Sequence, residues 1–279
     1  MEKRIDRVIA ASERSARSPT HANRMIVAPD DFAATSPFLV LVEDWFGRPS
    51  GFPTHPHRGI QTVTFVLDGT LEHSDHTGGH GVLREGDVQW MTAGRGVLHS
   101  ELPHQDERAH TLQLWLNLPA ARKMIPARYV NQLRGDVAVT KLPGGEIRAY
   151  AGKAGDAVQP HGSDWPMTLL DIRVETGARL SIEVPAADRG FLYTIEGHAD
   201  IGTPATPVSP QTTAWFEPSP DGSARLDRLV IAASRPFRGL LFSSPPIDEP
   251  VVAYGPFVMN SEQEIRQAYA DYQSGRLTA

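Results

Sequence analysis

Residues Gln61–Ser74 read QTVTFVLDGTLEHS and carry the clearest indication of the fold class. Its first half is an apolar, β-branched run, and Asp68-Gly69 separates this run from a second one. Asp-Gly between two such runs is typical of a β-hairpin, because the tight turn needs backbone angles that glycine adopts easily. We therefore predict antiparallel strands in this part of the chain.

Sequence patterns typical of β-strands continue on both sides of this stretch. In residues 111–118 leucines alternate with Gln113, Trp115 and Asn117, so the two kinds of side chain would lie on opposite faces of a strand. The 24 Gly and 23 Pro of the chain predict many turns between short elements. A second β-rich series runs from 147 to about 242, where LYTIEGHA (192–199) echoes TFVLDGTL (64–71). The echo is explained either by two copies of one barrel or by a chance likeness of two hairpins. Both explanations predict an all-β fold.

Composition and charge exclude several classes of function. The formal net charge is −6 with a pI near 6.0, and Lys and Arg are scattered, so we expect no direct contact with nucleic acid. The chain has no cysteine, so a metal would have to bind to histidine, carboxylate or amide groups. No stretch approaches the roughly 20 apolar residues that span a bilayer, and the first residues do not resemble a signal peptide. We expect a cytoplasmic protein without a membrane partner.

The best helix signal lies between Ser261 and Gly275. Ser261 and Glu264 form a capping-box pattern, and Gly275 suits the C-terminal stop. One face of this helix would carry the apolar side chains of Ile265, Ala268, Tyr269 and Tyr272. We expect that face to pack on its own domain, the alternative being that it binds a partner protein.

Two pairs of residues with the same spacing carry the candidate chemistry. His55 and His57 lie two apart, as do His99 and Glu101, and on a strand such residues point to the same side. If the two strands face each other across a small barrel, three nitrogens and one oxygen converge on one metal ion. A six-coordinate ion would keep about two positions open for water, substrate or dioxygen. Taken singly, a histidine is more often a surface or hydrogen-bonded residue than a ligand.

Four segments of the sequence resemble the pirin family, which belongs to the cupin superfamily of small β-barrels. They are His55-Pro-His-Arg-Gly59, Gly86-Asp-Val-Gln-Trp-Met-Thr-Ala-Gly-Arg-Gly-Val-Leu-His-Ser-Glu101, Leu112-Gln-Leu-Trp-Leu-Asn-Leu118 and Gly255-Pro-Phe-Val-Met-Asn260. The resemblance implies two cupin barrels in tandem with a short C-terminal helix. We expect a metal-binding barrel over residues 1–130, and a barrel without a metal site over 131–279 that ends in the helix 261–275.

The resemblance also implies a site and an activity. In pirins one iron ion is bound by the residues that match His55, His57, His99 and Glu101; several members act as quercetin 2,3-dioxygenases, and animal members serve as transcriptional cofactors. We therefore expect one divalent ion, Fe(II) first with Zn, Mn, Cu, Ni and Co as alternatives, in a dioxygenase that takes a flavonol-like aromatic substrate and dioxygen. Glu101 would be the catalytic base. The alternative is a non-enzymatic, redox-sensing iron module that binds a protein partner such as a transcription factor.

Departures from the general cupin pattern bear on this site. That pattern has a ligand glutamate where this chain has Gln61, which would be either a polar neighbour of the metal ligands or a space-filling residue. If strand parity continues from His57, Gln61 and the apolar residues 63, 65 and 67 line the cavity. In the second barrel, Glu183 and Pro185 take the places of the histidine pair. A nearby cluster of histidines is expected in a solvated loop rather than at a second metal: His73, His76 and His80.

Overall fold

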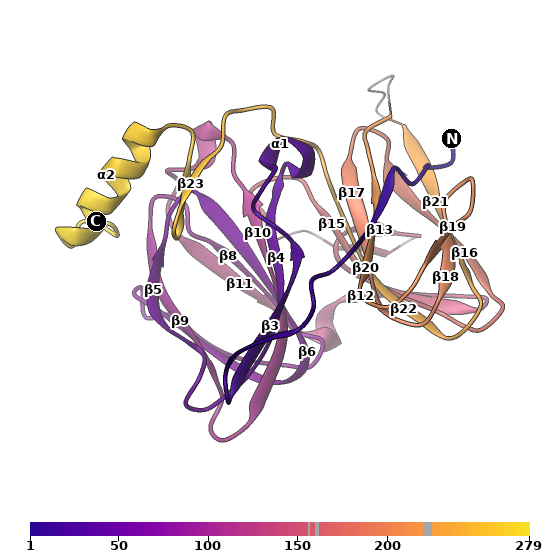
Figure 1. Ribbon diagram of the computed structural model, residues 1–279, viewed down its shortest axis with the longest axis horizontal. Helices are drawn as coiled ribbons and strands as arrows, with labels where there is room; N and C mark the ends of the chain where they lie inside the picture. The colour runs from indigo at the N-terminus through magenta and orange to yellow at the C-terminus, as the bar shows by residue number, and fades with distance from the viewer. Residues whose placement is uncertain (156, 160–161, 220–224) are drawn as a thin grey trace. The chain divides into compact units, whose positions relative to one another are not determined.

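The structure, a computed structural model, describes residues 1–155, 157–159, 162–219 and 225–279, and these consist mainly of β-strands (Figure 1). The chain divides into two compact units. The first-barrel unit comprises Ser12–Gly135, Gly162–Trp165 and Ile247–Ala279, and the second-barrel unit comprises Met1–Ala11, Asp136–His161 and Pro166–Pro246. The prediction of an all-β fold with a short C-terminal helix is confirmed.

The elements are short and follow one another closely. Those of the first-barrel unit are β2 (Ser15–Ser18), β3 (His21–Val27), α1 (Phe32–Thr35), β4 (Phe38–Gly47), β5 (Phe52–His57), β6 (Ile60–Asp75), β7 (His80–Arg84), β8 (Val88–Thr92), β9 (Val97–Pro103), β10 (Arg108–Asn117), η1 (Ala120–Arg122), β11 (Arg128–Gln132), β23 (Val252–Tyr254), β24 (Phe257–Met259) and α2 (Glu262–Gln273). The 3-10 helix η2 (Arg134–Asp136) lies at the division between the units. Those of the second-barrel unit are β1 (Arg7–Ala10), β12 (Ala138–Leu142), β13 (Gly145–Ala154), β14 (Ala157–Gln159), β15 (Thr168–Val174), β16 (Arg179–Pro185), β17 (Arg189–Glu196), β18 (Ala199–Ile201), β19 (Thr206–Val208), β20 (Thr212–Phe216), β21 (Leu226–Ala233) and β22 (Phe237–Ser244).

The stretch Gln61–Ser74 does not form a hairpin. It belongs to one long strand, β6, which bends at Gly69, where φ is +76°. Before the bend β6 pairs with β8 and β10, and after it β6 pairs with β7 and β9. A Cβ atom at Gly69 would lie 1.8 Å from the carbonyl oxygen of Arg108, so only glycine allows this close approach. The Asp-Gly signal therefore marks a bend within a strand, and the hairpin prediction is wrong.

The two units repeat one strand order. It is β11-β8-β6-β10-β4-β3 in the first-barrel unit and β1-β20-β17-β22-β15-β13 in the second. The end of β6 pairs with β7 and β9, and β9 pairs with β5; in the same way β18 pairs with β19 and β21, and β21 pairs with β16. The likeness of residues 64–71 and 192–199 is thus part of a repeat of the whole barrel. This favours duplication over chance.

Each unit is completed by a segment from the far end of the chain. β1 pairs with β20 of the second barrel, whereas β23, β24 and α2 belong to the first-barrel unit. The boundary expected between 130 and 131 lies close to the observed division after Gly135, but the terminal segments Met1–Ala11 and Ile247–Ala279 fall on the opposite sides from those expected. The order of the segments in the sequence did not reveal that the first segment belongs to the second barrel and the last segment to the first barrel.

The helix α2 packs on the first barrel. Ser261 caps it by accepting a hydrogen bond from the Glu264 amide, as the sequence predicted. Its buried residues Ile265 and Ala268 join β24, and Leu98 of β9 packs against the same cluster. We expected the helix in the second barrel because it follows that barrel in sequence, but its apolar face finds its core in the first.

The interiors of the two barrels differ in chemistry. In the second barrel a largely aliphatic cluster lies between the strands, and it includes Ile182 and Val184 of β16 and Ile231 of β21. Glu183, which takes the place of one histidine of the predicted pair, is exposed. In the first barrel the corresponding strands β5 and β9 carry the histidines instead.

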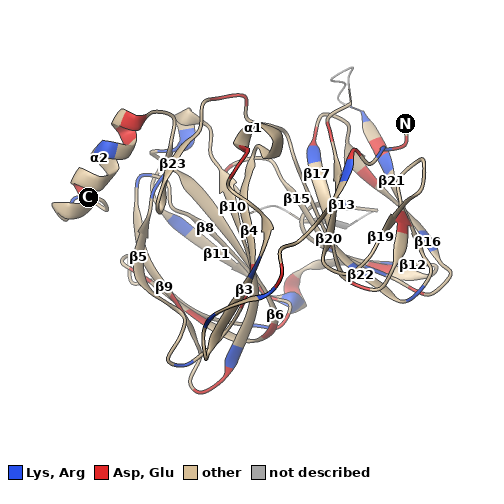
Figure 2. Cartoon of the chain, in the orientation of Figure 1, with Lys and Arg blue, Asp and Glu red and all other residues tan. Residues whose placement is uncertain are grey.

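Charged residues of both signs are interspersed along the strands of both units (Figure 2). Within the described parts of the chain, no helix is long and apolar enough to cross a membrane.

Candidate metal centre

Three histidines come together in the first-barrel unit. β5 and β9 are antiparallel neighbours, and His55 lies directly opposite His99 in their register. His57 lies two residues further along β5, and each imidazole offers a nitrogen within 4.8 Å of the nitrogens of the other two. Ligand atoms at roughly 2 Å from one ion are no more than about 4 Å apart. Small side-chain rotations therefore suffice to bring the three nitrogens onto one ion.

Two of the three rings bury a nitrogen that has no partner within the described residues. Nδ1 of His55 is 2.8 Å from the carbonyl oxygen of Pro53, and Nδ1 of His57 is 3.2 Å from that of Pro256. A carbonyl only accepts, so each Nδ1 carries the hydrogen and each Nε2 keeps its lone pair. Among the described residues, Nε2 of His57 and Nε2 of His99 are buried without a partner. Such atoms destabilise a fold, and a bound cation would satisfy both.

Burial keeps the imidazoles of His57 and His99 neutral. Desolvation, with a smaller effect of the neighbouring His55, lowers the pKa of His57 to about 3. Burial, together with His57 and His55, lowers the pKa of His99 well below its usual value. Neutral imidazole is the form that binds a metal. The donor set therefore fits a divalent ion that accepts nitrogen ligands.

Glu101 lies near the histidines, and its carboxylate is hydrogen-bonded on both oxygens. It is 2% exposed and shares the inward face of β9 with His99. Thr64 Oγ1 donates to Oε1 at 3.0 Å, and Gln113 Nε2 donates to Oε2 at 2.6 Å. Each oxygen keeps a further lone pair. Glu101 is outside the group whose ligand atoms lie within 4.8 Å of one another, so the structure groups three of the four predicted residues.

The side chain of Gln61 makes its hydrogen bonds away from the candidate ligands. Strand parity is broken at Gly59, where φ is +81° and a Cβ atom would lie 1.9 Å from the carbonyl oxygen of Val258. As a result Thr64, not Gln61, reaches Glu101. The Gln61 side chain donates to Thr92 Oγ1 and the Gly162 carbonyl and accepts from Ser163 Oγ. The prediction that Gln61, Val63, Phe65 and Leu67 line the metal cavity is therefore wrong for the first three, because they lie on the opposite face of β6 from Thr64.

The histidines of β6, of β7 and of the turn between them, His73, His76 and His80, lie in two different environments. His76 and His80 are exposed, and His80 pairs with Glu72 at 3.0 Å. His73 is fully buried on β6 beside His99. The expectation of a solvated position is met by the first two and is wrong for His73.

The C-terminal segment supports the strand that carries the histidines. Its Pro256 carbonyl accepts a hydrogen bond from His57. Its Asp271, on α2, accepts one from Arg58 at 2.7 Å. Lys123, 1% exposed, donates to the carbonyl oxygens of Gly59 at 2.9 Å and Val258 at 3.1 Å. These contacts were not predicted from the sequence. The one signal that could have found them was the segment 255–260, noted for its resemblance and not for its position.

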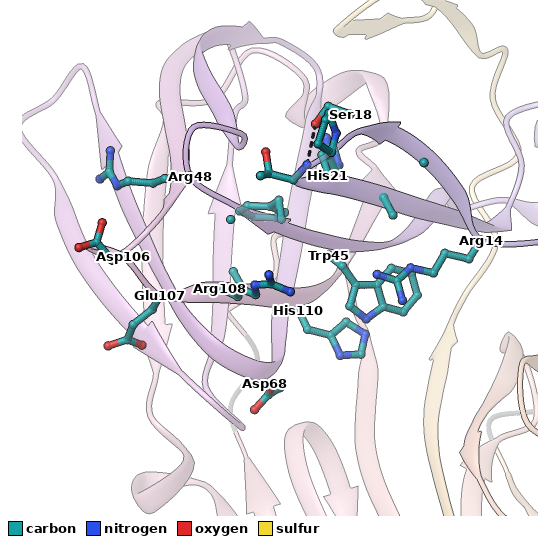
Figure 3. A pocket seen from close by; sticks show the side chains of 17 residues that line it. Arg14, Ser18, His21, Trp45, Arg48, Asp68, Asp106, Glu107, Arg108 and His110 are labelled. Carbon is teal, nitrogen blue, oxygen red and sulfur yellow. Dashed lines mark hydrogen bonds between the residues drawn. The ribbon is translucent and has the colours of Figure 1, made fainter.

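A separate cavity of about 840 Å³ lies elsewhere on the first-barrel unit (Figure 3). The Arg14 guanidinium lies 4.2 Å from the centroid of the Trp45 ring, and His110 stacks on the same indole with centroids 4.6 Å apart. Charged residues of both signs line the cavity, including Arg108 and Asp106. None of its lining residues belongs to the histidine group.

Comparisons with known proteins agree with this architecture. The family model described as Pirin matches residues 19–116, and the model described as Pirin C-terminal cupin domain matches residues 169–278. Human Pirin is 34% identical over 98% of this chain and 93% of its own length. A structure titled quercetin 2,3-dioxygenase, from Acinetobacter baumannii, has a TM-score of 0.88 and 28% identity, covering 100% of this chain and 99% of that one. The structure of the bacterial pirin YhhW from Escherichia coli in complex with nickel(II) has a TM-score of 0.65 and 23% identity, covering 86% of this chain and 100% of that one.

Proposed function

The chain belongs to the pirin family, and on that premise we propose that its first barrel holds one divalent metal ion and oxidises a flavonol such as quercetin with dioxygen. The observation that carries the proposal is the group of three imidazoles, two of which have buried nitrogens without a partner in the described parts of the chain. His55, His57 and His99 would hold the ion, and Glu101 would supply an oxygen. The name of the Acinetobacter relative and the nickel bound by the Escherichia coli pirin support the activity and the ion, respectively.

The donor set is compatible with Fe(II), which we propose as the ion. Nitrogen and oxygen ligands without sulfur suit Fe(II) and also nickel, cobalt and manganese, whereas a zinc site typically closes at four ligands. When bound, the ion would supply Lewis acidity that lowers the pKa of a substrate hydroxyl.

The chain's own groups would orient the substrate and take its proton. Glu101 is the proposed base, since a phenolic hydroxyl that loses its proton to this carboxylate becomes an electron-rich anion. The hydrogen bonds from Thr64 and Gln113 fix the orientation of the carboxylate. The Trp115 ring lies edge-on to His57, with centroids 5.0 Å apart, and offers an apolar surface to a planar ring.

The test combines metal analysis with oxygen uptake. The purified chain is loaded with Fe(II) without oxygen, its metal content is measured, and oxygen consumption is followed with quercetin. We expect one ion per chain and uptake that depends on quercetin. His57→Ala should lose both, whereas His198→Ala, which changes an exposed histidine of the second barrel, should keep both.

The outcomes separate the two candidate functions. Full loading without uptake above the buffer rate would refute the dioxygenase and leave a metal-dependent regulatory module as the function. A folded wild-type chain that binds no ion would refute the metal centre itself. The same assay with the other divalent ions identifies which ion supports the reaction.

A further inference from the structure

A fourth histidine, His73, lies against the candidate metal centre. It is fully buried on β6, directly opposite Glu101 of β9. Its Nε2 is 3.2 Å from Nδ1 of His99, and the two ring centroids are 5.3 Å apart. The ring of Tyr129 lies on it with centroids 5.5 Å apart. His73 thus touches a candidate ligand without belonging to the group of three.

Packing alone does not explain a histidine at this position. Nδ1 of His73 is buried and has no hydrogen-bond partner within the described residues. A leucine or phenylalanine would fill the same space against Tyr129 without burying an unpaired polar atom. The imidazole is therefore better explained by the one hydrogen bond that it makes, the bond to His99.

The other two rings of the group show what such a bond does. Nδ1 of His55 and Nδ1 of His57 each face a backbone carbonyl, which fixes the hydrogen on Nδ1 and leaves Nε2 for an ion. Nδ1 of His99 faces the nitrogen of His73 instead. A neutral imidazole accepts in the same way when its own hydrogen lies on its other nitrogen. With that arrangement all three rings present Nε2.

We propose that His73 is a positioning residue for His99: its Nε2 accepts the Nδ1–H of His99 and so directs the His99 Nε2 lone pair toward the ion. The inference rests on the proposed metal centre. It requires the metal-loaded chain to hold His73 with its hydrogen on Nδ1. Unlike a carbonyl, this imidazole can also reverse the bond and donate to His99 when no ion is bound.

Substitution at His73 tests the positioning role through metal affinity. Co(II) is titrated in competition with a chelator, and its visible absorption reports the ligand geometry. Phenylalanine fills the space and accepts no hydrogen bond, so His73→Phe should bind Co(II) about 10–100-fold more weakly, with an altered spectrum. Glutamine keeps an acceptor, so His73→Gln should restore most of the affinity. His80→Phe is the matched control, because His80 is exposed and pairs with Glu72.

Two results would overturn the inference. The first is wild-type affinity and an unchanged Co(II) spectrum in a folded His73→Phe chain, as judged by its melting without metal. The second needs no variant: ¹⁵N-histidine NMR of the Zn(II)-loaded wild type would have to place the His73 hydrogen on Nε2 rather than Nδ1. A wild type that binds neither ion would instead refute the metal centre, so the two failures are distinguishable.

Discussion

Replacing Asp271 with alanine tests whether a partly buried charge pair holds the C-terminal segment on the first barrel. The Arg58 and Asp271 side chains are 5% and 17% exposed, and their closest nitrogen and oxygen are 2.7 Å apart. Removing one partner of a buried pair costs about 3–5 kcal/mol. Since Asp271 is partly exposed and Arg58 keeps carbonyl acceptors, we expect a loss of about 2–3 kcal/mol in the free energy of local opening.

Amide hydrogen exchange of α2 is the assay, because the loss concerns the docking of one segment. A loss of about 2–3 kcal/mol lowers the protection of its amides about 30- to 150-fold, since each 1.36 kcal/mol is tenfold. Hydrogen bonds from Arg58 and then Gln267 hold the pKa of Asp271 below its usual value of 3.8. The contribution is therefore present above that value and is lost as the pH falls through the lower folded value. Acidification should weaken protection in the wild type more than in the variant.

Glu262→Ala is the matched control on the same helix. Glu262 pairs with Arg266 at 3.3 Å, but the two side chains are 80% and 70% exposed, so we expect no measurable change in protection. If α2 in the Asp271→Ala chain exchanged as slowly as in the wild type, the pair would not hold the segment, and the reasoning would fail.

Three other substitutions test acid–base and backbone features of the two units. Burial raises the pKa of Asp188 from 3.8 to about 6. The folded chain therefore binds more protons than the unfolded chain between these two values, and its stability falls as the pH rises through them. Asp188→Asn should remove this loss of about 3 kcal/mol, which is measured by urea unfolding at pH 4 and pH 7. Gly59→Ala should lower the melting temperature and the Co(II) affinity together, because the positive φ alone costs about 1–2 kcal/mol and the added Cβ meets a carbonyl. Gln61→Leu should destabilise the fold by about 1–3 kcal/mol, since Ser163 Oγ loses the acceptor of its hydrogen and the Gly162 carbonyl loses one donor, while metal content stays at the wild-type level.

The candidate ligands could be proposed from the sequence because side-chain direction along a strand is a local property. Spacing by two placed His55 with His57, and His99 with Glu101, on common faces, and the structure sets His55 opposite His99. The alternating burial of β9 follows from the same rule. What spacing could not give is the hydrogen bonding of Glu101, which depends on two other strands.

The predictions from the sequence were wrong where a single glycine changes the direction of the backbone. Gly69 was expected to close a hairpin and instead bends a continuous strand, because the residues on its two sides pair with different strands. Gly59 breaks the parity that was carried from His57 to Gln61. Both outcomes depend on partners far away in sequence, which no local pattern specifies. The same holds for α2, whose apolar face predicted burial without identifying the core that it joins.

The exchange of the terminal segments has a consequence for synthesis on the ribosome. The carbonyl that orients His57 belongs to Pro256, which is translated only after every strand of the second barrel. A nascent chain can form the strands of the first barrel early, yet the histidine pair gains its last support about two hundred residues later. We therefore expect a prematurely terminated product to bind an ion at the proposed metal centre more weakly than the full chain does.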